Sequence, residues 1–304
     1  MYKAKHILLL LLTALTLASC GTTNTVPITG RKQHLLVSDA QVLSLSNQQY
    51  QQYMKTAKPS TDVAATAMVK RVGERLAQAV VTYLNQHNLG AEVSQYKWEF
   101  NLVQDKEANA FCMPGGKIVV YEGLLPYTQN EASLAIVLGH EIAHAVAKHS
   151  AEQMSKQMRA QYGAQALNIL LSQTGSATSQ IAQDVFGFGA NSLLRKYSRD
   201  NESEADYMGL IFAAMAGYDP NVAVSFWQRM SQGTSSVPEF FSDHPSDAKR
   251  IAAIKSELPE ALKYYKPQAA VTTSSSKPAT TAKRKTTTSA KRKTTRGKTT
   301  AKRK

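Results

Sequence analysis

The feature that most constrains this chain is an apolar run from Leu134 to Val146 that carries two histidines and a glutamate. Its centre reads His140-Glu141-Ile142-Ala143-His144, and the run is long enough for a buried helix. Side chains four positions apart share one face of a helix, so His140 and His144 can present two imidazole nitrogens to one metal ion. Burying an unpaired carboxylate costs free energy, so a buried Glu141 favours a functional role for this residue. The alternative is a buried helix whose histidines only make hydrogen bonds.

Zinc is the metal that this spacing predicts, at one ion per chain. A third protein ligand and a water would complete four coordination positions, and zinc lowers the pKa of such a water to about 7. Glu141 directly follows the first histidine and can reach that water as a general base. Glu141 is therefore the candidate catalytic residue.

The third metal ligand has to come from another part of the chain. Ala and Ser stand where a metzincin would carry Gly and His after the second histidine, which excludes that class. Residues 198–206 offer several carboxylates on one predicted helix. Glu202 and Asp206 share a face of it, so one can bind the metal while the other accepts a hydrogen bond from a ligand histidine. Spacing alone does not choose between Glu202 and Glu204.

The first 20 residues predict export and lipid attachment. Lysines precede an almost wholly apolar segment, Ile7 to Leu17, which is shorter than the ~20 residues of a membrane-spanning helix. The segment ends Leu-Ala-Ser-Cys20, which resembles a bacterial lipobox, and the following Gly favours the outer membrane over the inner one. We expect residues 1–19 to be a lipoprotein signal peptide and Cys20 to be lipidated. The alternative is a plain signal peptide with a chance cysteine.

The net charge of +14 belongs to the C-terminal tail. Residues 267–304 hold 12 of the 36 Lys and Arg residues and no acid, and two more lysines lie in the predicted signal peptide. Residues 20–266 thus hold 22 basic and 22 acidic residues and form one neutral domain. The Lys-, Arg- and Thr-rich tail cannot bury a core and is predicted to be disordered. It is either a tether to anionic envelope polymer or a solvated extension. No nucleic-acid partner is expected, because the export signal places the tail outside the cytoplasm.

The domain is predicted to be mostly helical with a small sheet. Apolar spacing and capping residues predict helices at residues 38–54, 61–87, 128–158, 191–216, 220–233 and 246–258. Alternation and a Pro-Gly-Gly turn predict strands at 96–102, 108–113 and 117–122. Residues 22–35 should hold no regular structure, and residues 160–190 form a helical hairpin or a mobile cover.

Four single residues complete these expectations. Thr128 and Glu131 have the spacing of a capping box at the start of the metal-binding helix. His149 falls on the far side of that helix from the metal and receives no role. Cys112 remains the only thiol once Cys20 is lipidated, so no intrachain disulfide is expected.

Four motifs resemble the Ste-type and HtpX-type metallopeptidases, peptidase family forty-eight, and within it the lipoprotein members related to LoiP and BepA. The motifs are Pro27-Ile28-Thr29-Gly30-Arg31, Asn109-Ala110-Phe111 with Pro114-Gly115-Gly116, His140-Glu141-x-x-His144, and Asn201-Glu202-x-Glu204-Ala205-Asp206. The resemblance implies that Glu202 is the third ligand and that Asp206 supports a ligand histidine. It also implies an α+β, mostly helical, gluzincin-type fold whose small sheet borders the active-site cleft.

The resemblance further implies a role for His244, which lies in a His-Pro-Ser loop. In BepA-like members such a histidine can occupy the fourth zinc position and hold the enzyme latent. The alternative is a loop histidine that binds substrate or nothing. The chain departs from the integral-membrane members because it has no multi-span hydrophobic segments. It departs from BepA because a basic tail follows the domain here, whereas helical repeats follow it in BepA.

These features predict a zinc metalloendopeptidase, lipid-anchored in the bacterial envelope and facing the periplasm, that cleaves unfolded or misassembled envelope proteins. Residues 109–113 are expected to pair with an extended substrate backbone. Tyr197, Arg199 and His244 are candidates for stabilising the oxyanion. The alternative function is a latent or chaperone-like lipoprotein whose zinc site is regulatory or structural.

Overall fold

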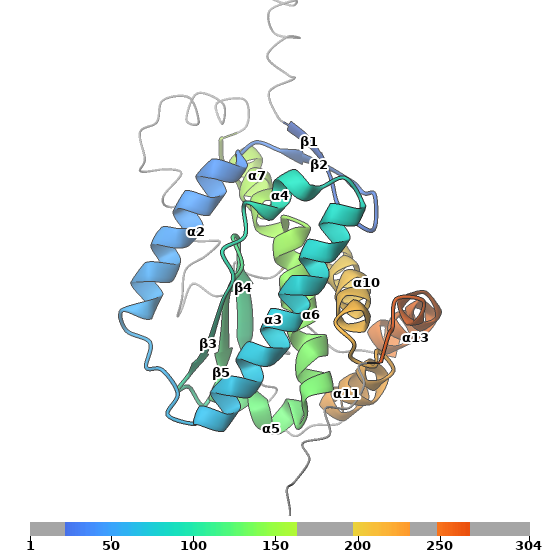
Figure 1. The fold of residues 1–304 in the computed structure, drawn as a ribbon. Coiled ribbons are helices and arrows are strands. Elements are labelled where there is room, and N and C mark those ends of the chain that lie inside the picture. The colour runs from blue at the N-terminus through green and yellow to red at the C-terminus, as the bar shows by residue number, and fades with distance from the viewer. Residues whose placement is uncertain (1–21, 163–196, 232–247, 268–304) are drawn as a thin grey trace, which may run out of the picture. The chain divides into compact units, whose positions relative to one another are not determined.

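A three-stranded sheet and the helices on its two faces form the centre of the fold (Figure 1). The computed structural model describes residues 22–162, 197–231 and 248–267. The central strand of the sheet, β5 (Lys117–Tyr121), pairs in parallel with β3 (Glu99–Val103) and antiparallel with β4 (Ala110–Met113). The bounds of all three strands lie within three residues of the predicted ones. The mostly helical α+β architecture is therefore confirmed.

The β4–β5 hairpin forms because its turn carries two glycines with positive φ, 88° at Gly115 and 82° at Gly116. Every residue of β5 is buried, and its side chains alternate between two hydrophobic clusters. Ile118 and Val120 belong to the cluster of α3, α6 and α10, whereas Val119 faces the cluster of α2 and α7. A strand buried on both faces is the reason that helices cover both sides of the sheet.

The segment before the first helix is a hairpin, so the prediction of no regular structure there is wrong. Strand β1 (Thr22–Thr25) pairs antiparallel with β2 (Lys32–Leu35), and Gly30 has a positive φ of 69° in the connection. The hairpin forms because Val26 and Leu35 bury their side chains in the two clusters. We call residues 22–35 the N-terminal arm.

Helix α2 (Asp39–Met54) has Ser38 as its N-cap, and the capping box of Ser38 with Gln41 is complete. Helix α3 (Val63–Gln86) is capped by Asp62, and the chain leaves it at Asn88 with a φ of 60°. Short helices precede β3 and the metal-binding helix, namely α4 (Gly90–Val93), η1 (Glu122–Leu124) and α5 (Leu125–Thr128). The bounds of α2 and α3 lie within two residues of the predicted ranges, whereas the three short helices were not predicted.

The helix with the two histidines, α6 (Glu131–Val146), begins one residue after Asn130, whose side chain accepts a hydrogen bond from the Ser133 amide. The predicted capping box is wrong, because Thr128 ends α5 and bonds the Leu125 carbonyl instead.

The prediction of one continuous helix to residue 158 is also wrong. Lys148 has a φ of 54°, and a new helix, α7 (His149–Tyr162), starts directly after it. The break lets α6 pack in one hydrophobic cluster while Ala151, Met154 and Met158 of α7 pack in the other. Lys148 is held in this turn by ion pairs to Asp39 and Glu92, 2.9 and 3.5 Å long. Apolar residues continue across the break, so the sequence pattern does not reveal it.

Three helices complete the described domain: α10 (Arg199–Met215), α11 (Val222–Ser231) and α13 (Ala248–Leu262). Helix α10 ends before Gly217, as predicted, but it starts at the N-cap Ser198 and so later than the predicted start at residue 191. Helix α13 continues through Pro259, four residues beyond its predicted end. Within the described residues, no helix combines the length and the apolar character that crossing a membrane requires.

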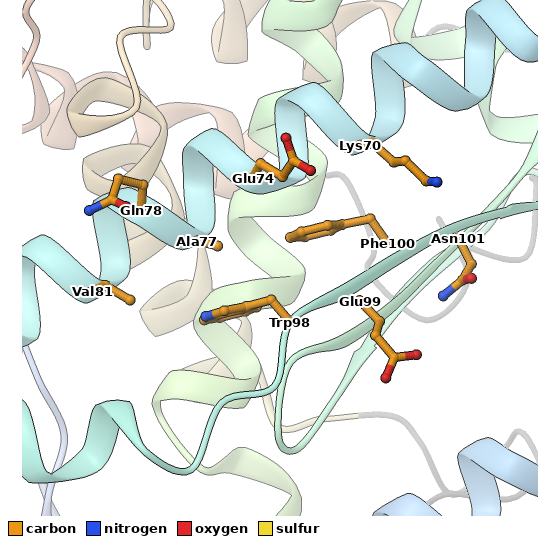
Figure 2. A pocket seen from close by; sticks show the side chains of 9 residues that line it. All are labelled: Lys70, Glu74, Ala77, Gln78, Val81, Trp98, Glu99, Phe100 and Asn101. Atoms are coloured by element: carbon orange, nitrogen blue, oxygen red, sulfur yellow. The ribbon is translucent and has the colours of Figure 1, made fainter.

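A groove of about 540 Å³ lies between α3 and the outer edge of β3 (Figure 2). Trp98 and Phe100 form its floor with parallel rings, and Lys70 and Glu74 of α3 stand at its rim. His140 and His144 are not among its lining residues. This groove is thus separate from the predicted metal site.

Glu257 of α13 predicts a pH-dependent stability. Burial raises the pKa of its carboxyl to about 7, and the negative charge of Asp206 adds to this effect. Below pH 4.5 both folded and unfolded chains are protonated and the residue costs nothing. As the pH rises toward 7, the unfolded chain ionises first, so stability is lost. The shift corresponds to ~3 kcal/mol for a fully buried group, and partial exposure reduces it to ~1–2 kcal/mol.

We therefore expect Glu257→Gln to raise the free energy of unfolding by ~1–2 kcal/mol at pH 8 and to leave it nearly unchanged at pH 4. Denaturant unfolding at the two pH values measures this. Glu260→Gln, which removes a partly exposed ion pair with Lys263 on the same helix, is the control. Equal effects of Glu257→Gln at both pH values would contradict the expectation.

Candidate metal centre

Two glycines bring the metal-binding helix and α10 into close contact. A Cβ on Gly139 would lie 2.8 Å from the Gly209 carbonyl oxygen, and one on Gly209 would lie 2.7 Å from the His140 amide nitrogen. These distances are too short for any side chain, so the helices approach to backbone contact at this point. Gly139 precedes His140 directly, and Gly209 lies three residues after Asp206. The crossing therefore sets the first turns of α10 beside the histidines of α6.

Three buried side chains converge at this crossing. The Nε2 atoms of His140 and His144 lie 3.0 Å apart. Oxygens of the Glu202 carboxylate lie 3.4 Å from Nε2 of His140 and 3.5 Å from Nε2 of His144. One ligand atom from each of the three residues falls within 4.8 Å of the others. The structure thus brings together the two histidines and the glutamate that the sequence reasoning selected as ligands.

His140 is oriented by a carboxylate and an arginine. Its Nδ1 lies 2.9 Å from Oδ1 of Asp206, which leaves Nε2 directed at Glu202. Arg250 of α13 donates to both oxygens of Asp206 at 2.7 Å, and its guanidinium stacks 3.7 Å above the ring of Trp227. The sequence reasoning placed Asp206 beside a ligand histidine but missed Arg250. No local pattern in its helix marks it.

His144 is oriented by a second histidine instead of a carboxylate. Its Nδ1 lies 2.7 Å from Nδ1 of His149, and Nε2 of His149 lies 2.9 Å from Oε2 of Glu204. The expectation that His149 faces away from the metal is wrong, because the break at Lys148 turns the start of α7 back toward α6. The only sequence signal for this contact is that His149 follows His144 by five residues. That spacing indicates a contact only if the helix is known to break between the two histidines.

The electrostatics of the site favour a cation between the three ligands. Burial lowers the pKa of His140, but its hydrogen bond to Asp206 and the nearby charge of Glu202 outweigh burial and raise the pKa to about 9. Burial would raise the pKa of Asp206, yet the charge of Arg250 and the contact with His140 hold it below its usual value. Burial also lowers the pKa of His149, which keeps that imidazole neutral. Two imidazoles and a carboxylate are a donor set suited to Zn²⁺.

The other predicted residues take up different positions. Glu141 is buried in α6 beside His140. The ring of Tyr197 stacks on His144 with a centroid distance of 4.1 Å, and its hydroxyl lies 2.9 Å from Oγ of Ser150. Arg199 is exposed at the start of α10. His244 and Cys20 lie outside the described residues.

The comparison with protein families decides the class of this domain. Residues 63–258, which are well over half of the chain, match the model of peptidase family M48. This chain belongs to family M48. The match includes α6 and α10, which carry the three candidate ligands, and ends inside α13.

Curated relatives of this M48 domain come from mitochondria and from bacteria. Mitochondrial metalloendopeptidase OMA1 of Schizosaccharomyces pombe is 40% identical over 172 residues, which are 56% of this chain and 49% of the relative. Human metalloendopeptidase OMA1 is 32% identical, over 78% of this chain and 46% of the relative. The beta-barrel assembly-enhancing protease of Escherichia coli is 26% identical, over 82% of this chain and 51% of the relative. The chain spans about half the length of each.

The glycine contact yields a testable prediction for this M48 domain. Gly209→Ala adds a methyl group that meets the backbone of α6, so α10 must move away and carry Glu202 with it. The gain in helix propensity is ~1 kcal/mol, and overpacking at a closed contact costs ~1–3 kcal/mol. We expect lower stability and at least about tenfold weaker zinc binding, since ligand placement has to hold within ~0.5 Å.

Thermal unfolding and zinc titration against a chelator measure both effects. Ser203→Ala is the matched control, because position 203 is exposed on the same helix and the change also raises helix propensity. Zinc affinity of Gly209→Ala equal to that of the control would show that the close crossing is not needed.

Proposed function

We propose that this chain is a zinc-dependent endopeptidase that is lipid-anchored in the bacterial envelope and cleaves unfolded or misassembled envelope proteins. The observation that carries the proposal is the convergence of His140, His144 and Glu202, with Glu141 on the same helix, in a domain of family M48. Family membership supports peptide hydrolysis. The ligand geometry supports a bound divalent metal.

His140, His144 and Glu202 would hold one zinc ion, which when bound supplies a Lewis acid that polarises the scissile carbonyl. Asp206 and His149 orient the two imidazoles so that each Nε2 lone pair points at the site. Glu141 takes a proton from the attacking water on its carboxylate and then delivers it to the nitrogen of the leaving amine. Its place next to His140 on α6 supports this role.

The edge strand β4 supports binding of an extended substrate. Among the described residues, β4 pairs with β5 alone, so its other edge can accept a substrate backbone in β-pairing. Strand β4 also packs against α6, which places this edge near the histidines. A folded protein does not offer a free extended segment, so recognition through the main chain favours unfolded substrates.

The envelope location rests on the lipobox resemblance at Cys20 and on the name of a bacterial relative, the beta-barrel assembly-enhancing protease. The OMA1 relatives are mitochondrial, so the family alone does not fix a compartment. The basic residues of the tail, 267–304, are proposed to contact anionic polymer of the envelope. Removal of the tail should therefore alter location and leave catalysis intact.

The deciding experiment measures zinc content and cleavage with the mature full-length chain. A disulfide-bonded test protein is offered in its native form and after reduction and blocking of its thiols, which unfolds it without changing its sequence. We expect cleavage of the unfolded form only, lost on chelation and restored by zinc. Zinc bound in stoichiometric amount with no cleavage of either form would favour the alternative, a chaperone-like lipoprotein with a structural or regulatory metal.

A further inference from the structure

The N-terminal arm contributes an arginine to a partly buried charge cluster next to the metal centre. Arg31 lies directly before β2 and donates to two carboxylates from two different helices. Its Nε and Nη2 lie 2.9 and 2.7 Å from Oε2 of Glu204 on α10, and its Nη2 lies 2.9 Å from Oε2 of Glu152 on α7. The arm is therefore bonded to both helices that flank α6 at this side.

Other side chains of the arm strengthen the same attachment. Thr29 donates to Oε1 of Glu204, and Gln33 donates to Glu152 at 2.9 Å and to the Ala147 carbonyl at 2.7 Å. Ala147 is the C-cap of the metal-binding helix. The Glu204 carboxylate thus receives hydrogen bonds from the Thr29 hydroxyl, from two guanidinium nitrogens of Arg31 and from the ring of His149. A buried carboxylate with this many donors is held in one orientation.

The Glu204 carboxylate, which accepts hydrogen bonds from Arg31 and Thr29, fixes the tautomer of His149. A carboxylate can only accept, so Nε2 of His149, 2.9 Å away, carries the proton. Nδ1 of the neutral imidazole then has a lone pair, and it faces Nδ1 of His144 at 2.7 Å. His144 must donate there, which leaves its Nε2 unprotonated and directed toward Glu202. The hydrogen bond from His149 to Glu204 thus determines which nitrogen carries the proton in His149 and, through His149, in His144.

We infer that the N-terminal arm is part of the metal site, because Arg31 positions Glu204, Glu204 positions His149, and His149 presents the His144 lone pair to the metal. Arg31 and His149 are positioning residues, since neither reaches the reacting atoms. His140 differs, because one carboxylate contacts it directly. This inference rests on the proposed zinc site. It predicts that one ligand depends on a segment more than 100 residues away in sequence.

The first test measures zinc affinity of the mature full-length chain by chelator competition. Removal of a group that orients a ligand histidine typically weakens metal binding by ~10–100-fold. We expect a loss in this range for Arg31→Ala and for His149→Ala, and a smaller loss for Arg31→Lys, which keeps the charge without the planar fork. The control is Arg71→Ala, which removes an exposed arginine paired with Glu131 at the far end of α6 and should leave zinc affinity unchanged.

The second test is a double-mutant cycle. If Arg31 acts through His149, the double variant Arg31→Ala/His149→Ala binds zinc no more weakly than His149→Ala alone. If the two substitutions instead acted independently, their fold losses in zinc affinity would multiply. Imidazole ¹⁵N chemical shifts of the zinc-free protein give a separate readout, with His144 protonated at Nδ1 in the parent and as a tautomer mixture in His149→Ala.

The outcomes separate this inference from the proposed function. A parent protein that binds no zinc overturns both. If the parent protein binds zinc, two results overturn the inference alone. One is an Arg31→Ala variant with the zinc affinity of the parent, and the other is a double-mutant cycle in which the two losses multiply. If circular dichroism shows that Arg31→Ala does not fold, Glu204→Gln takes its place, because it keeps the side-chain shape while weakening the fixed direction of the His149 hydrogen bond. Unchanged affinity and unchanged His144 shifts in that variant would equally refute the inference.

Discussion

Glu141→Gln is expected to keep zinc bound while lowering kcat for peptide hydrolysis by about 10²–10⁴-fold. The amide keeps the size of the buried side chain, so the packing of α6 and the placement of its histidines are retained. It cannot accept a proton from the attacking water, however, and this is the step that the carboxylate is proposed to perform. KM for an unfolded substrate should change little, because the substrate backbone is proposed to bind along β4.

Steady-state kinetics and metal analysis of the same preparation measure this prediction. Glu131→Gln, at the first turn of α6, is a suitable control because it changes the same residue type on the same helix outside the metal centre. The control should keep its kcat. Full activity of Glu141→Gln would show that this residue is not the general base. Loss of zinc from the variant would show that the substitution disturbs metal binding, and its low activity would then say nothing about proton transfer.

Glu202→Gln is expected to weaken zinc binding on the order of 10³-fold. Four-coordinate zinc in zinc-finger peptides is bound with apparent free energies of ~10–16 kcal/mol, and by that scale one of four ligand positions contributes ~3–4 kcal/mol. The carboxylate of Glu202 lies within 3.5 Å of both imidazole Nε2 atoms, and only its ionised form adds negative charge at the metal. Loss of catalysis follows from loss of metal.

The neighbouring acids make this prediction selective. Asp200→Asn changes an exposed carboxylate in the first turn of α10 and should not affect zinc binding. Glu204→Gln should give the smaller loss expected of a positioning residue. A larger loss for Glu204 than for Glu202 would exchange the roles of these two glutamates, which the spacing in the sequence could not distinguish.

The site could be predicted from the sequence as far as its geometry is local. His140, Glu141 and His144 lie on one turn of one helix, so the helical period alone brings the histidines together. Glu202 is 58 residues beyond His144, and family resemblance, not period, selected it over Glu204. The close contact of Gly139 with Gly209, which makes that pairing possible, leaves no local pattern because an isolated glycine in a helix has several explanations.

The features that the sequence did not predict depend on long-range contacts. The break at Lys148 is stabilised by Asp39 and Glu92 from elsewhere in the chain, and it turns His149 toward His144. The N-terminal arm is likewise ordered by partners on α7 and α10. The parallel pairing of β3 with β5 was missed for the same reason, since alternation identifies a strand but not its neighbour.

The complete burial of α6 from Ser133 to Val146 has a consequence for the metal-free protein. A helix with no solvent-facing side is held by its neighbours, so its amide hydrogens should exchange with water only when the whole domain opens. In a zinc finger the metal supplies the folding energy, and its removal unfolds the chain. Here the scaffold of the ligands stands on its own hydrophobic contacts. Withdrawal of zinc should therefore switch the chemistry off reversibly, and readmitted zinc should find its ligands already in place.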